Sequence, residues 1–158
     1  MNHRGLLHHL VLRVSDLPRA APFFDAILGA LGYELTLAEP GYQDWKRWEL
    51  GTPHRIVLVQ ARTPSAPATP LPTAPGLHHL AFAAVGREDV DRFHAEVLVP
   101  LAARGLCTIE DPPCDCPDYE EGYYATFFRD HDGLRYEFAW TPAYGAEQAR
   151  RGRPAPAE

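Results

Sequence analysis

Residues 7–17 read LHHLVLRVSDL and residues 77–86 read LHHLAFAAVG, so one tetrapeptide occurs twice, each time ahead of an apolar run. The two copies lie 70 positions apart, which exceeds the ~20–50 residues of a solenoid repeat. This spacing indicates two copies of one half-domain. With 158 residues, the chain is long enough to bury a core as one domain built from two halves.

The composition limits the classes of partner. The formal net charge is -6 and 46% of the residues are hydrophobic, and no basic stripe is present that would hold a phosphate backbone. We therefore expect no nucleic-acid partner. No apolar stretch approaches the ~20 residues of a membrane span, and the first twelve residues lack the pattern of a signal peptide. We expect a cytoplasmic protein without a membrane partner.

The chain has three cysteines, Cys107, Cys114 and Cys116. An odd number with two of them only two positions apart suits reduced thiols better than a disulfide framework. Cys114 and Cys116 are either a pair able to bind a soft metal or simple exposed loop thiols.

The first half predicts a strand, a helix and three further strands. Leu10, Leu12 and Val14 alternate with His9 and Arg13, as in a strand with one apolar face. The following segment has a helix start at Ser15 or Asp16, a proline in the first turn and a glycine at its end. The expected ranges are 7–14 for the first strand, about 15–32 for the helix, and 33–38, 45–50 and 55–61 for the remaining strands.

A proline-rich segment precedes the second half, which starts again with a strand and a helix. Residues 61–76 contain five prolines among small residues and are typical of an extended connector. We expect a strand at 77–84, a helix at 87–104 that Pro100 kinks or breaks, a loop at 107–122, and strands at 123–129 and 134–140 around an Asp-Gly turn. The predicted organisation is module 1 (1–62), linker (63–76), module 2 (77–142) and a mobile tail (143–158).

Three residues with metal-binding side chains are predicted to share one surface. Strand alternation places His79 opposite the apolar positions that should meet the helix, and it places Glu137 opposite the aromatic residues of the last strand. His9 has the same position in the first half. Two imidazoles and one carboxylate form the facial triad that holds a divalent metal and leaves coordination positions open. Each residue alone would more commonly be a solvated or hydrogen-bonded side chain.

At this point a family resemblance is visible. The stretches HHLVLRVSDLPRAAPFFDAILGALGYEL (8–35), LHHLAFAAVGREDVDRFHAEVL (77–98) and YYATFFRDHDGLRYEF (123–138) resemble the vicinal oxygen chelate superfamily, the group of glyoxalases, bleomycin-resistance proteins and extradiol dioxygenases. The last stretch resembles the family ending D-P-D-G-x-x-x-E, with His131 in the proline position. The resemblance covers nearly all of residues 5–140.

The resemblance implies an α+β fold in which two βαβββ modules form a curved mixed sheet around a cleft, with helices on the outer face. It implies His9, His79 and Glu137 as ligands of one divalent ion, which could be Zn, Ni, Mn, Co or Fe(II). The fourth family position falls at about Val57, which cannot bind metal, so the chain resembles the three-ligand members. Three ligands leave room for a substrate that chelates through two neighbouring oxygens.

The implied function is a glyoxalase-like lyase or isomerase that stabilises an enolate or alkoxide, with Glu137 as both ligand and catalytic base. Arg13 resembles the glyoxalase arginine that contacts a substrate carboxylate, and it is equally explained as a surface arginine. Tyr123, Phe127 and Trp45 are candidate substrate-binding walls, although aromatic residues at strand spacing are more often core.

Two other functions remain open. An extradiol dioxygenase with Fe(II) would use the same triad, and a metal-free binding protein of the bleomycin-resistance type would hold a small molecule in the cleft. The expected partners are a small-molecule substrate and a second copy of the chain in a homodimer. The modules pair either within one chain or by exchange between two subunits.

Overall fold

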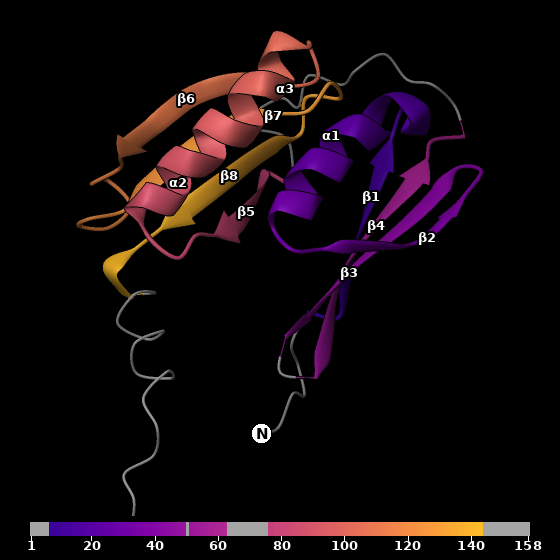
Figure 1. The fold of residues 1–158 in the computed structure, drawn as a ribbon, viewed down its shortest axis with the longest axis horizontal. Coiled ribbons are helices and arrows are strands. Elements are labelled where there is room, and N and C mark those ends of the chain that lie inside the picture. The colour runs from indigo at the N-terminus through magenta and orange to yellow at the C-terminus, as the bar shows by residue number, and fades with distance from the viewer. Residues whose placement is uncertain (1–6, 50, 63–75, 144–158) are drawn as a thin grey trace, which may run out of the picture. The chain divides into compact units, whose positions relative to one another are not determined.

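The computed structural model describes residues 7–49, 51–62 and 76–143 and contains two four-stranded mixed sheets (Figure 1). The chain divides into two compact units. The first comprises residues 1–71 together with 131–133, and the second comprises residues 72–130 together with 134–158. Each sheet belongs to one strand–helix–three-strand module, which confirms the predicted α+β fold with two βαβββ modules.

Module 1 has the strand order β1-β4-β3-β2. β1 pairs with β4 in parallel, and the other neighbours are antiparallel. Leu12 of β1 and Leu58 of β4 are buried, whereas His9 and Arg13 on the opposite face of β1 are exposed. The elements are β1 (His9–Val14), α1 (Leu17–Ala30), β2 (Glu34–Glu39), β3 (Tyr42–Glu49) and β4 (Thr52–Gln60).

The helix α1 begins and ends where the sequence predicts. Asp16 is the N-cap, and its carboxylate accepts a hydrogen bond from the Arg19 amide over 3.1 Å. The helix stops before Gly32, whose φ of +77° is costly for other residues. Four apolar side chains of α1 are almost fully buried: Phe23, Phe24, Ile27 and Leu28.

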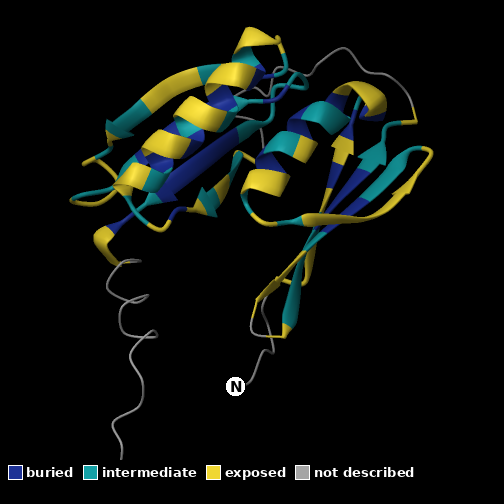
Figure 2. Cartoon of the chain, in the orientation of Figure 1, coloured by how far each residue is buried: buried dark blue, intermediate teal, exposed yellow. Residues whose placement is uncertain are grey.

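Module 2 repeats this arrangement with the strand order β5-β8-β7-β6. β5 is parallel to β8, and Phe93 of α2 packs on Phe138 with ring centroids 4.5 Å apart. Figure 2 shows β8 buried along most of its length, and its neighbour β7 has the same burial pattern. The elements are β5 (His79–Ala83), α2 (Arg87–Phe93), η1 (His94–Leu98), α3 (Val99–Ala103), β6 (Thr108–Asp115), β7 (Tyr124–Arg129) and β8 (Arg135–Trp140).

The winding of the second helix changes just before Pro100, where the sequence predicts a kink or a break. Proline has no amide hydrogen, and its ring clashes with the preceding turn. The helix does not break there. Instead residues His94–Leu98 form a π-helical turn, η1, and α3 continues to Ala103. The wider turn just before Pro100 is the local adjustment with which a helix passes such a residue.

The prediction of a loop at 107–122 was wrong for its first half, because residues Thr108–Asp115 form β6. Pro112 and Pro113 argued against a strand, yet β6 is the edge of its sheet, where a missing donor is tolerated. The pairing with β7 shifts register around these prolines. Among the described helices, none has the length and hydropathy to span a bilayer. The linker at 63–75 and the tail from 144 lie outside the described residues.

Candidate active site

The two modules place their key residues in matching registers. In each module the first strand runs parallel to the last, and the histidine at its start pairs with an arginine. Two residues further along, the last strands differ, because one carries an apolar side chain and the other a carboxylate. The matching pairs are His9 with Arg55 and His79 with Arg135, then Val11 with Val57 and Ala81 with Glu137.

In module 2, His79 and Glu137 lie side by side. The Nε2 atom of His79 is 3.2 Å from the Oε2 atom of Glu137. The side chain of His79 is 33% exposed and that of Glu137 only 4%, so the imidazole covers the carboxylate and faces the solvent. The sequence predicted this pair from strand alternation, and the structure brings the two side chains into contact.

Tyr123 contacts the other oxygen of the same carboxylate. Its hydroxyl donates to Oε1 of Glu137 over 2.5 Å. A buried carboxylate is stabilised only if its lone pairs are satisfied, and Tyr123 and His79 together satisfy both oxygens of Glu137. The orientation of Glu137 is therefore fixed from two sides.

Each repeated histidine also contacts the histidine before it. His78 Nδ1 lies 2.7 Å from His79 Nδ1, and His8 Nδ1 lies 2.9 Å from His9 Nδ1. A hydrogen bond at Nδ1 orients the ring and leaves Nε2 for another partner. The doubled histidine of the repeated tetrapeptide thus has one structural consequence in both modules, since the first ring orients the second.

The contact between His79 and Glu137 suits a divalent cation. Two metal–ligand bonds of about 2.1 Å that span this N···O distance would enclose an angle of about 100°. This is close to the right angle between neighbouring positions of an octahedron, and an imidazole nitrogen with a carboxylate oxygen is a common donor set. Within the described ranges, no group of three or more histidine, cysteine or acidic side chains converges on one point. The pair alone therefore supplies no more than two of the ligands that a metal site needs.

Module 1 carries a buried carboxylate that the sequence analysis missed. Asp44 of β3 pairs with Val57 and is 3% exposed. Arg55 donates to both of its oxygens, over 3.2 and 2.7 Å, and Lys46 Nζ lies 3.3 Å away. Burial raises the pKa of Asp44, but hydrogen bonds from Arg55 and Lys46 outweigh it and lower the pKa overall. Asp44 is therefore ionised, and both of its carboxylate oxygens accept hydrogen bonds from Arg55.

Module 2 has a similar cluster around Glu110 of β6. Arg129 Nε donates to Oε1 over 2.5 Å, and Arg135 Nε donates to Oε2 over 2.7 Å. Burial again opposes ionisation, and the hydrogen bonds from Arg135 and Arg129 lower the pKa of Glu110. The Arg135 guanidinium also lies 4.2 Å from the centre of the Phe127 ring, a cation–π contact. Phe127 is thereby held beside Glu137, its register partner.

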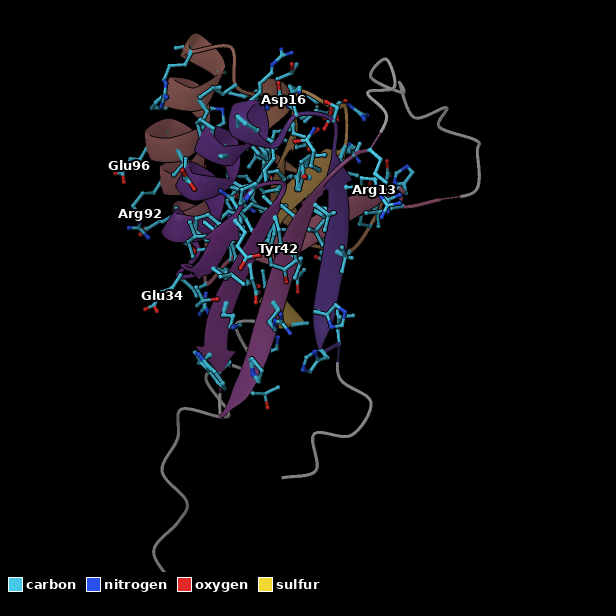
Figure 3. The ribbon with its side chains drawn as sticks, turned by 90° about the vertical axis from the view of Figure 1, so that its right-hand side faces the viewer. Arg13, Asp16, Glu34, Tyr42, Arg92 and Glu96 are labelled. Atoms are coloured by element: carbon cyan, nitrogen blue, oxygen red, sulfur yellow. The ribbon has the colours of Figure 1, made fainter. Side chains whose placement is uncertain are left out.

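The remaining predicted residues fall on two different faces. Arg13 is exposed on β1, on the same face as His9, and Figure 3 labels it together with Tyr42 of β3. Trp45 is 4% exposed and pairs with Ile56, on the face that also carries Leu58. It therefore packs in the core of module 1. The sequence shows that Asp44 and Trp45 point to opposite faces of a strand. It does not show that Asp44 is buried.

Comparisons with known proteins agree with this architecture. The model of the Glyoxalase/Bleomycin resistance protein/Dioxygenase superfamily matches residues 6–138. An uncharacterized protein of Bacillus subtilis, YqjT, is 29% identical over 136 residues, covering 83% of this chain and 95% of the relative.

Two solved structures illustrate the structural likeness. A putative glyoxalase from Bacillus halodurans is 28% identical with a TM-score of 0.67, covering 87% of this chain and 97% of that one. A lactoylglutathione lyase from Agrobacterium tumefaciens shares the fold at 21% identity and a TM-score of 0.59, covering 91% and 99%. The chain belongs to the Glyoxalase/Bleomycin resistance protein/Dioxygenase superfamily.

Proposed function

We propose that this protein is a divalent-metal enzyme of the glyoxalase-like lyase or isomerase type, acting on a small substrate with two neighbouring oxygens. The observation that carries the proposal is the contact of 3.2 Å between His79 Nε2 and Glu137 Oε2. These two atoms would offer two ligands to a divalent ion, on a face of the sheet where Ala81 and Ala83 are exposed. Small side chains there leave room for a ligand above the sheet.

We propose His9 as the third ligand, on the grounds of the repeat. His9 occupies in β1 the register position that His79 occupies in β5, and its ring is held by His8 in the same way. In a homodimer, which we also propose, His9 of one copy serves either its own chain or the other copy. The ion is Zn, Ni, Mn, Co or Fe(II), all of which accept imidazole and carboxylate ligands.

The chain's own residues supply orientation and proton movement. When bound, a divalent cation acts as a Lewis acid that favours an enolate or alkoxide. Tyr123 keeps the Glu137 carboxylate in one orientation by donating to Oε1, so Glu137 would take up and return the substrate proton at Oε2, the oxygen beside His79. Tyr123 is half-buried and packs on the buried cluster that includes Phe127, so Tyr123 offers the apolar wall beside the carboxylate, and Arg13 binds an anionic group of the substrate.

A metal-free binding protein is the second candidate. The direct contact with His79 and the hydrogen bond from Tyr123 satisfy Glu137 without any ion. A face built in this way could hold a neutral or cationic small molecule, with the aromatic rings as walls. Metal binding separates the two candidates.

The test is metal analysis of protein purified without a chelator or a histidine tag, followed by calorimetric titration with Mn²⁺, Zn²⁺ and Ni²⁺ of protein whose thiols have been blocked with iodoacetamide, so that no cysteine binds these ions. We expect one ion per chain in the wild type. We expect no measurable binding by His79→Ala or Glu137→Gln, and unchanged binding by the control His54→Ala, which alters a histidine of β4 outside the proposed ligand set. The loaded protein is then assayed with adducts of 2-oxoaldehydes and thiols, and with catechols for the dioxygenase alternative.

Absence of binding in the wild type with all three ions would contradict the enzyme proposal and favour the metal-free candidate. Binding that survives in both His79→Ala and Glu137→Gln would place the ion elsewhere. Circular dichroism of every variant separates loss of a ligand from loss of the fold. Light scattering of the wild type tests the homodimer.

A further inference from the structure

Cys114 and Cys116 form a close pair of thiols at the edge of the second sheet. Their Sγ atoms lie 3.9 Å apart, and neither cysteine is in a disulfide. Cys114 lies in β6, which is the outer strand, and Cys116 follows the end of that strand. Both side chains are half-buried, so reagents in solution can reach them.

The separation of the two sulfurs suits a bridging atom. Cys114 and Cys116 are two positions apart along an extended chain, where Cα atoms lie about 6.6 Å from each other, near the upper limit for a disulfide. A cation with bonds of about 2.3 Å to each sulfur would span the observed 3.9 Å at an angle of about 116°. This angle lies between the tetrahedral and the trigonal value.

The surroundings of the pair keep the two thiols facing each other. The Cys116 amide donates to the Tyr123 carbonyl over 2.8 Å, and its side chain packs on the cluster of Ala125, Phe127 and Ala139. The residue between the cysteines, Asp115, is exposed and pairs with Arg87. Asp115 is thus held away from the sulfurs by a different partner.

The third cysteine provides an internal contrast. Cys107 is 9% exposed, and its thiol lies 3.6 Å from the carbonyl oxygen of Leu98. Burial raises the pKa of Cys107 to about 11, and burial together with the neighbouring Cys114 raises the pKa of Cys116 to about 11 as well, so the contrast lies in the neighbouring thiol. Cys107 has no second thiol beside it within the described residues. Cys107 is therefore a structural thiol, and its replacement serves as the control for replacements of Cys114 and Cys116.

We propose that Cys114 and Cys116 form a dithiolate site for one soft, thiophilic cation, with ligands other than those of the neighbouring His79–Glu137 pair. Soft thiolate ligands select cations of this class over Mg²⁺ or Ca²⁺. On binding, two S–H bonds are replaced by two sulfur–cation bonds, and two protons pass to the solvent. Since no third histidine, cysteine or acidic group converges with them in the described part of the chain, water or a small solute completes the coordination.

The probe is Cd²⁺, added to fully reduced protein in which both His79→Ala and Glu137→Gln have been introduced, so that the proposed active site does not compete. The readout is the near-ultraviolet charge-transfer band of a cadmium–thiolate bond. We expect the band to saturate at one Cd²⁺ per chain. It should disappear in Cys114→Ser and in Cys116→Ser, and it should remain in the matched control Cys107→Ser.

No band in the reduced protein would overturn the proposal, as would a band that persists when both Cys114 and Cys116 are replaced. If a single serine variant unfolds, cadmium-113 NMR of the parent decides instead, because its chemical shift reports whether sulfur is bound. Failure of the manganese, zinc and nickel titrations above would leave this result untouched, so the two proposals fail separately.

Discussion

Modules 1 and 2 share one framework and differ at one central position of the last strand. In both, a histidine begins the first strand and an arginine stands opposite it on the last strand. At the next position on the same face, module 1 has Val57 and module 2 has Glu137. The repeat thus preserves the strand pairing of both halves, while only one half carries a carboxylate at the strand centre.

The charged clusters of the two modules show a second difference. Arg55 and Arg135 occupy the same register position, and each binds a carboxylate, but the carboxylate comes from β3 in module 1 and from β6 in module 2. Asp44 fills the position that Phe127 fills in module 2. Module 1 therefore uses this face for a buried ion cluster, and module 2 leaves room there for an aromatic ring beside Glu137.

The largest expected effect follows from giving module 2 the side chain of module 1. Glu137→Val should lower the affinity for a divalent ion by more than about 100-fold, because it removes a direct ligand. Valine also removes the acceptor of the Tyr123 hydroxyl, so the free energy of unfolding should fall by about 1 kcal/mol. Calorimetric titration and a urea unfolding curve measure the two quantities. Unchanged affinity would show that the difference between the modules has no bearing on metal binding.

The two ion clusters should differ in their contribution to stability. Asp44→Asn leaves Arg55 and Lys46 without their buried partner and should lower the free energy of unfolding by about 2 kcal/mol. The side chain of Glu110 is 27% exposed, so Glu110→Gln should lower the free energy of unfolding by about 1 kcal/mol or less. Urea unfolding of both variants provides the comparison. Equal losses would contradict the view that the module 1 cluster is the more deeply buried of the two.

The Asp44 cluster should also make stability depend on pH. The pKa of Asp44 in the folded protein lies below its ordinary value of 3.8, so the unfolded chain takes up this proton first. The stabilisation is present above pH 4 and declines as the pH falls below about 4. The difference in unfolding free energy between wild type and Asp44→Asn should therefore shrink between pH 5 and about pH 3. If the difference stayed constant over this pH range, the charge of Asp44 would not contribute to the stability of the fold.

The smallest effect concerns the helix starts. Asp16 caps α1 with its side chain, whereas Gly86 at the start of α2 makes no such hydrogen bond. Asp16→Ala should lower the free energy of unfolding by about 1 kcal/mol, and Gly86→Ser should raise it by roughly a few tenths of a kcal/mol. Gly86 has an extended φ of -177°, and a Cβ there would meet nothing within 4 Å. Thermal unfolding measures both changes. If Gly86→Ser lowered the unfolding temperature, the view that α2 lacks a side-chain cap that serine can supply would be contradicted.

The sequence predicted the modules well because alternation and the repeat are local signals. The strands, the cap at Asp16 and the pairing of His79 with Glu137 all follow from period-two patterns and from turn residues. The strand β6 was missed because its prolines oppose strand formation everywhere except at a sheet edge, and edge position is a tertiary property. The burial of Asp44 and Trp45 depends in the same way on neighbouring strands, which no short stretch of sequence reveals.

The most direct test of the central claim is an anomalous difference map from crystals grown with Mn²⁺ or Zn²⁺. Module 2 should show a peak within bonding distance of His79 Nε2 and Glu137 Oε2, and the corresponding place beside Val57 in module 1 should show none. A peak beside Val57 and Asp44, or no peak in either module from protein saturated with both ions, would contradict the assignment of the metal site to module 2.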